Sequence, residues 1–265
     1  MTDARTGSDL VHTELVDGVG IVTFNRPDRH NAMDDEMSDV SKKAMRWALT
    51  APAVRCILLR GNGKSFCSGR DTSVLGHRAG GESDYDFVRR HQQIRLETLE
   101  SQKVVIAALK GGVIGGGMEM ALAADIRIAD TTARFALPEV GFALVPDTGA
   151  TQLLPRLVGP ARAKLIIIGG ERIDAQTAYE WGLVEKLVAP DELDDTALAL
   201  ATRIAGLSPL AVAQAKQLID QSHTGSLRDG FSGELHAQVA MFTSADYQES
   251  KAARREGRPP HYEGR

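Results

Sequence analysis

Two glutamates are the first candidates for chemistry, because each lies within an otherwise apolar segment. Glu119 belongs to segment 118–122 and Glu139 to segment 135–140. A carboxylate among apolar neighbours is expected to be partly buried, which raises its pKa toward the range that suits proton transfer. Structural roles are equally open at this point: Glu119 as a partner of a helix dipole, and Glu139 as a loop carboxylate bound to backbone N–H groups.

Two glycine-rich segments each follow a predicted strand. They are residues 61–71, GNGKSFCSGRD, and residues 111–117, GGVIGGG. Neither fits a nucleotide-binding motif: the second lacks the dinucleotide fingerprint, and a P-loop ending at Lys64-Ser65 would place its first glycine at Leu58, inside a strand. Glycines 115–117 precede a predicted helix over 118–124, whose first amides have no intrahelical partner. Because no side chains block these amides, the segment predicts an oxyanion site.

The elements around these residues indicate an α/β core. Apolar runs at 10–16 and 19–24, separated by Asp17-Gly18, predict a β-hairpin. Alternation of strands with helices in the first half is typical of an α/β fold. Further strands are predicted at 55–60, 104–109, 126–129 and 134–136, and helices at 34–49, 85–100 and 118–124.

The second half reads as mostly helical, with helices predicted at 160–168, 175–181, 191–205 and 209–221. From about residue 201 the chain is expected to form a helical appendage. An apolar stripe at positions 193, 197, 200, 204 and 207 could serve assembly or pack on the core of its own chain. The basic tail, residues 254–265, is expected to be solvated.

Composition excludes several classes of protein. The 265 residues are 43% hydrophobic and 25% charged, as in a globular protein, and the net charge of −4 argues against sequence-independent nucleic-acid binding. We expect no membrane span, because the longest apolar stretch, 104–128, contains five glycines and several charges. Cys56 and Cys67 are interpreted as reduced thiols in a cytoplasmic protein. The seven histidines show no zinc-like spacing, so no metal centre is predicted.

An ordered series of motifs resembles the crotonase (enoyl-CoA hydratase/isomerase) superfamily. The series comprises residues 25–27, 31–33, 66–71, 115–119, 138–139, 154–159, 175–184 and 256–262. No single motif is decisive, but the series in this order and spacing is specific. The resemblance runs from about residue 10 to the end. It implies an α/β fold with a crotonase-like spiral core of repeated ββα units over residues 1–200. Residues 201–265 would form a helical region for assembly and ligand cover.

The resemblance also implies roles for individual residues. The backbone N–H groups of Arg70 and Gly116 would hold the thioester oxygen as it becomes an enolate. Glu119 would orient and deprotonate water and Glu139 would protonate C2, so that a trans-2-enoyl-CoA gains water and becomes a 3-hydroxyacyl-CoA. The CoA thioester is the substrate, and no separate cofactor is implied. The coenzyme A part would be held by two loops that contain Arg29, Asn31, Ala32, Ser68, Asp71 and Thr72.

Asp147 departs from the hydratase pattern, which usually has glycine there. Dienoyl-CoA isomerases of the family have acids matching Glu119, Glu139 and Asp147, so an enoyl- or dienoyl-CoA isomerase is the alternative. A third carboxylate would disfavour ionisation of its neighbours. Asp147 could equally cap the following turn, since Asp before Thr-Gly is a good turn residue. The branch that displaces aryl halide also has Asp there, but the two glutamates fit proton transfer better.

Other readings are less favoured. An acyl-CoA-binding relative without turnover is disfavoured because both glutamates are present. RNA binding, known for one branch of the superfamily, is disfavoured by the net charge and the lack of a lysine-rich stripe. The resemblance implies an acyl-CoA substrate as the small-molecule partner, with neither nucleic acid nor membrane, and a homotrimer or a hexamer formed by two trimers.

Overall fold

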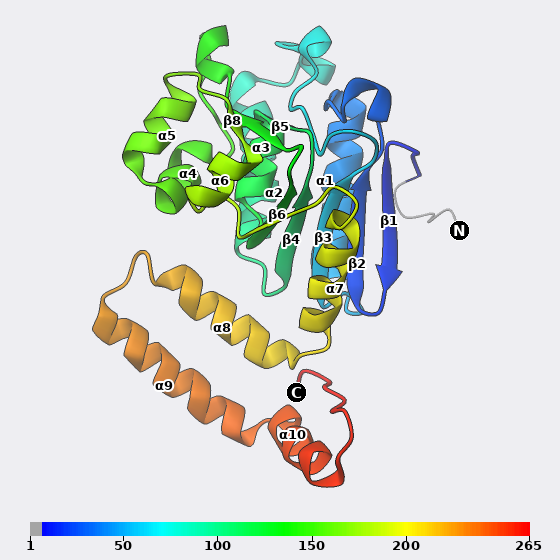
Figure 1. The fold of residues 1–265 in the computed structure, drawn as a ribbon, viewed down its shortest axis with the longest axis vertical. Helices are drawn as coiled ribbons and strands as arrows, with labels where there is room; N and C mark the ends of the chain where they lie inside the picture. Colours follow the sequence, from blue (N-terminus) through cyan, green and yellow to red (C-terminus); the bar gives the residue numbers. More distant parts are fainter. Residues whose placement is uncertain (1–6) are drawn as a thin grey trace.

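The computed structural model describes residues 7–265, apart from the side chain of Ala79. Its centre is a six-stranded sheet in the order β1-β2-β3-β4-β6-β9 (Figure 1). Only the β1–β2 pair is antiparallel, so the carboxyl ends of β2, β3, β4 and β6 meet at one edge of the sheet. The strands are β1 Val11–Val16, β2 Val19–Phe24, β3 Cys56–Gly61, β4 Val104–Leu109, β6 Ile126–Asp130 and β9 Lys186–Val188.

A second, three-stranded sheet lies beyond that edge. It has the order β5-β7-β8, with β5 Gly112–Ile114, β7 Arg134–Ala136 and β8 Ile173–Asp174. Each of β4 and β6 therefore continues, after a short break, into a strand of the second sheet. This repeated strand–strand connection turns the chain through successive layers, as the predicted α/β spiral requires.

Helices cover both faces of the large sheet. α1 packs on β1 and β2, and α7 packs on β3 and β4 from the other side. Strand alternation divides β3 accordingly: Ile57 and Leu59 join the core cluster that includes α1, whereas Cys56 and Leu58 join the cluster with α7. Burial on both faces explains why β4 is apolar throughout and β3 is apolar from Cys56 to Leu59. The helices are α1 Asp35–Thr50, α2 Asp84–Leu99, α3 Gly116–Leu122, α4 Ala150–Val158, α5 Pro160–Ile167, α6 Ala175–Glu180, α7 Leu193–Ala205, α8 Pro209–Gln221, α9 Leu227–Thr243 and α10 Ala245–Glu256.

The predicted hairpin is confirmed. β1 and β2 pair in full register around Asp17 and Gly18, whose φ angles are 49° and 79°, as a tight two-residue turn requires. The other predicted elements occur with shifts of one or two residues at their ends, whereas β5, β8, β9, α4, α9 and α10 were not assigned from sequence. α9 contains Gly230 and Gly233, which weaken its helical pattern. A Cβ on Gly233 would lie 2.7 Å from Leu218 of α8, so this glycine permits close helix packing.

α7 joins the core rather than the appendage. It buries Leu193, Ala197, Ala201 and Ala205, four residues apart, on the large sheet. The predicted division between residues 200 and 201 thus falls inside a single core helix. Helices α8, α9 and α10 extend away from the sheets (Figure 1).

Buried polar contacts hold the C-terminal helices and tail. Lys216 of α8 pairs at 2.5 Å with Asp125, which precedes β6. The Asp246 carboxylate accepts hydrogen bonds from the backbone N–H groups of Glu263 and Gly264. Arg55, at the amino end of β3, donates to the Tyr262 carbonyl at 2.8 Å. The tail is mostly exposed but is anchored at the opposite end of β3 from the first glycine-rich loop.

No single helix within residues 7–265 combines the length and apolar composition needed to cross a membrane. α7 and α8 reach those requirements only when taken together, and the chain bends by 109° between them.

One buried side chain fastens the first glycine-rich loop to the loop after β2. The Asn31 Nδ2 group donates to the carbonyls of Asn62, Ser65 and Phe66 at 2.8–3.1 Å, and its Oδ1 accepts from the Arg26 N–H at 2.7 Å. Asn31 is fully buried and has a φ of 56°, a conformation that asparagine tolerates better than most residues. The position of residues 61–71 therefore depends on Asn31.

We expect Asn31→Gly to lower the free energy of unfolding by about 2–3 kcal/mol, because glycine keeps the backbone conformation but leaves buried carbonyls without donors. Urea denaturation measures the loss. The control is Asn62→Ala, which removes an exposed side chain and should change stability by less than about 0.5 kcal/mol. Equal midpoints for Asn31→Gly and the parent protein would contradict the assignment.

Candidate active site

The two glycine-rich loops lie side by side at the carboxyl edge of the sheet. Cys67 pairs with Val113: the Cys67 N–H donates to the Gly112 carbonyl, and the Ile114 N–H donates to the Cys67 carbonyl at 3.0 Å. A Cβ on Gly117 would lie 2.2 Å from the Cys67 carbonyl oxygen, so no side chain fits there. Glycine at this position is therefore a packing requirement of the pair of loops.

This packing brings the amides of Arg70 and Gly116 together. A Cβ added to Gly69 would lie 3.3 Å from the Gly116 nitrogen, so the first loop passes directly beside that amide. Within residues 7–265 neither the Arg70 N–H nor the Gly116 N–H has a hydrogen-bond partner. The Cβ direction of Gly116 faces open space. Two adjacent unpaired amides are the arrangement that holds an oxyanion.

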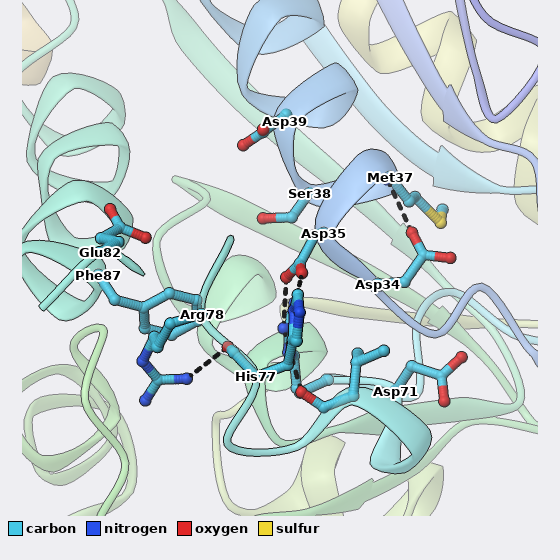
Figure 2. Close-up of polar contacts among 12 residues, drawn as sticks. Asp34, Asp35, Met37, Ser38, Asp39, Asp71, His77, Arg78, Glu82 and Phe87 are labelled. Atoms are coloured by element: carbon cyan, nitrogen blue, oxygen red, sulfur yellow. Dashed lines mark hydrogen bonds and ion pairs between the residues drawn. The ribbon is translucent and has the colours of Figure 1, made fainter. Parts of the chain in front are cut away.

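The Arg70 side chain has a different task from its backbone. Its Nη2 donates to Asp35 at the start of α1 at 2.5 Å, and the His77 Nδ1 atom lies 2.6 Å from the other Asp35 oxygen. The hydrogen bond from Arg70 is the main cause that lowers the pKa of Asp35. Figure 2 shows His77 directed at Asp35 and Arg78 beside the Phe87 ring, 3.9 Å from its centroid. These contacts fix the loop after residue 70 to α1 and α2.

Glu119 is 2% exposed and held by three donors. Its Oε1 accepts from the Thr148 and Ala150 N–H groups at 2.9 and 3.1 Å, and its Oε2 accepts from the Thr148 hydroxyl at 2.6 Å. Glu119 lies in the first turn of α3, three residues after Gly116. Its three hydrogen bonds fix the orientation of its carboxylate.

Glu139 has the opposite environment. It begins a short 3₁₀ helix, Glu139–Phe142, and its buried Oε2 has no hydrogen-bond partner among the residues that the structure describes. Its Oε1 lies close to Gly115, where a Cβ would come within 2.9 Å. Burial raises the pKa of Glu139 to about 7, and the negative charges of Glu119 and Asp147 act in the same direction. Glu139 can therefore give or take a proton near neutral pH.

Asp147 completes a group of three acids. Its carbonyl accepts from the Gln92 side chain at 2.7 Å, and burial, followed by the charge of Glu119, raises the pKa of its carboxyl. The amides of Thr148 and Ala150, which follow Asp147, donate to Glu119 rather than to the Asp147 carboxylate.

Three contributors were not identified from sequence. Thr148 supplies two of the three bonds to Glu119. From α2, the Gln92 side chain donates to the Asp147 backbone carbonyl, and Arg95 interacts electrostatically with Glu119 and Asp147. The sequence Asp-Thr-Gly at 147–149, directly after the apolar residues 143–146, could have marked Thr148 as a candidate site residue. No local pattern separated Gln92 and Arg95 from the other polar residues of α2.

The six residues predicted to contact coenzyme A differ in accessibility. Asn31 is buried in its internal bonds, and Asp71 is held by Ser73 and by Arg26 at 2.7 Å. The hydrogen bonds from Ser73, together with Arg26, lower the pKa of Asp71 to about 2. The other four are exposed or partly exposed on the two neighbouring loops: Arg29, Ala32, Ser68 and Thr72.

Cys56 and Cys67 are free and buried, and burial raises the pKa of each thiol to about 12. Such thiols are poor nucleophiles, which excludes them from the candidate chemistry. In the described part of the chain, no group of three or more His, Cys, Asp or Glu side chains has a metal-binding arrangement.

Comparison with known proteins agrees with this geometry. The profile of the family described as Enoyl-CoA hydratase/isomerase matches residues 14–265. The 1,2-epoxyphenylacetyl-CoA isomerase of Escherichia coli is 32% identical over 97% of this chain and 98% of its own. The short-chain-enoyl-CoA hydratase of Clostridium acetobutylicum is 36% identical over 89% of this chain and 90% of its own.

The fold leads to the same family. The crystal structure of enoyl-CoA hydratase from Bacillus anthracis superimposes with a TM-score of 0.88 at 31% identity, covering 97% of this chain and all of that one. The chain therefore belongs to the enoyl-CoA hydratase/isomerase family, the crotonase superfamily, and is an enzyme of that family. The predicted α/β crotonase-like fold is confirmed.

The raised pKa of Glu139 predicts a pH-dependent stability difference. In the unfolded chain a glutamate has a pKa near its model value of 4.5, against about 7 in the fold. Its stabilising contribution is thus present below about pH 4.5 and lost as the pH rises through about 7. Relative to the parent protein, Glu139→Gln should gain stability between pH 5 and pH 8, measured by urea denaturation. Exposed Glu171→Gln is the control, and a Glu139→Gln difference independent of pH would contradict the assignment.

Proposed function

We propose that the protein is an enoyl-CoA hydratase that adds water reversibly to a trans-2-enoyl-CoA and forms a 3-hydroxyacyl-CoA. The observation that carries the proposal is a pair of glutamates in different environments beside two unpaired amides. Glu119 is an oriented acceptor, whereas Glu139 has a pKa of about 7. Hydration needs both kinds of group, one to take a proton from water and one to give a proton to carbon.

The thioester oxygen would accept hydrogen bonds from the Arg70 and Gly116 amides. As the hydroxyl adds to C3, negative charge moves onto this oxygen, and preorganised donors stabilise it. Loss of one such donor typically costs about 3–4 kcal/mol in the transition state. This role uses the backbone of Arg70 and agrees with the separate engagement of its side chain by Asp35.

The proton transfers follow from the two carboxyl groups. Glu119 would hold the water and take one of its protons while the water oxygen forms a bond to C3. Protonated Glu139 would give its proton to C2, which completes the addition. The proton taken up by Glu119 then returns to Glu139 by exchange with solvent, so that the next turnover starts from the same state. Burial of Glu139 keeps an acid available near pH 7.

An enoyl- or dienoyl-CoA isomerase is the second candidate, and Asp147 is the observation that favours it. Its carboxyl is partly buried, interacts electrostatically with Glu119 and has a raised pKa. A third acid could move a proton between carbons further along the acyl chain, without net addition of water. The E. coli relative named 1,2-epoxyphenylacetyl-CoA isomerase acts on an epoxide, so its similarity supports isomerase chemistry in general rather than a double-bond shift.

Absorbance of the conjugated enoyl thioester distinguishes the two candidates. We expect the parent protein to consume crotonyl-CoA, and Glu119→Gln and Glu139→Gln to lose at least about 10²-fold in kcat, as loss of general acid–base catalysis implies. Asp147→Asn should retain most hydration. If the parent protein leaves both crotonyl-CoA and a longer 2-enoyl-CoA unchanged but shifts the double bond of 3-enoyl- or dienoyl-CoA, and Asp147→Asn abolishes that shift, the isomerase proposal replaces the hydratase proposal.

We also propose that the chain assembles into a homotrimer or a dimer of trimers through its C-terminal helices. One face of α9 presents large apolar side chains to solvent at near four-residue spacing, with exposed fractions between 49% and 79%. Such a face is expected to be covered in an assembled protein. Its members are Leu227, Phe231, Leu235, Val239 and Phe242.

Light scattering after size-exclusion chromatography tests the assembly. We expect an oligomeric mass for the parent protein and a shift toward the 28.5 kDa monomer for a Phe231→Asp/Leu235→Asp variant, because charges on the apolar face would be buried in the interface. Glu234→Gln, an exposed change on the same helix, should leave the mass unchanged. A monomeric parent protein would contradict the proposal.

A further inference from the structure

α2 presents two polar side chains to the acids of the site. The Gln92 side chain donates to the Asp147 carbonyl at 2.7 Å. Arg95 lies three residues further along, and residues with this spacing share a helix face. Arg95 interacts electrostatically with Glu119, Cys67 and Asp147. The face of α2 that carries Gln92 and Arg95 is therefore directed at the segment that begins at Asp147, whose amides hold Glu119.

Arg95 differs from the other arginines around this site. Arg70 is bound by Asp35, Arg78 by Asp84, and Arg90 by Glu82 and Asp39. Within residues 7–265 no hydrogen bond or ion pair at contact distance joins Arg95 to another residue, and its Nε is buried without a partner. A guanidinium carries five donors in a fixed planar fork. Leaving these donors unpaired at a partly buried position costs free energy unless a ligand satisfies them.

The charge balance favours an anionic ligand. Burial lowers the pKa of Arg95 in spite of the opposing effect of Glu119, Cys67 and Asp147, so the surrounding charges do not fully compensate the cation. Burial also raises the pKa of Glu139 and Asp147, so it opposes the ionisation of both acids. A further carboxylate close to Arg95 would supply both the missing charge and two acceptors that match the fork.

We propose that Arg95 is a specificity-determining residue that binds a carboxylate on the acyl group, so that the substrate class is a CoA thioester of a short dicarboxylic acid. The proposal rests on the proposed function in one respect, because it assumes that an acyl thioester occupies this site. Glu119 would act at C3, and the face of α2 that carries Arg95 is directed at the segment that holds Glu119. The carboxylate would therefore follow C3 by one or two carbons, as in glutaconyl-CoA.

Matched thioesters test the assignment. Glutaconyl-CoA and trans-2-pentenoyl-CoA differ in whether the chain ends in a carboxylate or a methyl group, and glutaryl-CoA and pentanoyl-CoA are their saturated counterparts. For the full-length protein we expect kcat/KM to favour glutaconyl-CoA and calorimetric Kd to favour glutaryl-CoA. Arg95→Met should reduce both preferences by about 10- to 100-fold, the size expected for a hydrogen bond to a charged group. Arg95→Lys should lie between, because lysine keeps the charge but not the fork.

Arg89→Met is the control, since Arg89 is an exposed arginine of the same helix, and both preferences should stay unchanged. A parent protein that prefers the methyl-terminated thioesters overturns the proposal. The proposal is also overturned if Arg95→Met lowers kcat/KM by the same factor on both enoyl thioesters and shifts the pH profile. Arg95 would then act through Glu119 and Asp147 rather than on the substrate carboxylate. If Arg95→Met does not fold, the preference of the parent protein and the Lys variant still decide.

The two saturated thioesters, glutaryl-CoA and pentanoyl-CoA, test the carboxylate site independently of the proposed hydration. Absence of hydration for both enoyl thioesters, with a retained preference for glutaryl-CoA that depends on Arg95, would refute the hydratase and leave the carboxylate site in place. Hydration of both without an Arg95-dependent preference would refute the carboxylate site alone.

Discussion

The close approach of two backbone segments, at Gly117 and the Cys67 carbonyl, is the constraint on which the candidate site depends. There is no space for a side chain between them. Hydrogen bonds of 3.1 and 3.0 Å, made by the N–H and the carbonyl of Cys67, hold the segments in register. This contact sets the Arg70 amide beside the Gly116 amide. It also starts α3 at the point where Glu119 enters the site. Asn31 also holds the first loop in place, because its side chain donates to the Ser65 and Phe66 carbonyls.

Chemically similar groups acquire different properties here because their surroundings differ. Glu119 accepts from three donors supplied by residues 148 and 150, whereas Glu139 keeps one buried oxygen without a partner. The first arrangement orients a carboxylate, and the second makes ionisation costly. Pairs of titratable groups in contrasting environments are a general basis for assigning acid and base roles. Asp147 adds a third acid whose raised pKa links it to the same group.

The site also stores unfavourable energy. Burial raises the pKa of Glu139 and Asp147, and within residues 7–265 the Arg70 and Gly116 amides and the Arg95 Nε have no hydrogen-bond partner. Each of these features costs free energy, which a ligand with matching charge and hydrogen-bonding groups would offset. Strong packing on both faces of the large sheet, through α1 and α7, supplies the stability that such a site requires.

Local sequence determined the elements and the order of the motifs. Apolar runs and the Asp17-Gly18 turn predicted the strands and the hairpin, and the motif series predicted the family and its fold. Tertiary structure alone decided the surroundings of the acids, because Thr148, Arg95 and Glu119 come from segments up to 53 positions apart that meet only when the sheets are assembled. Burial and hydrogen-bond partners depend on those distant neighbours, so no local pattern could show that Arg95 lacks a partner or that Thr148 holds Glu119.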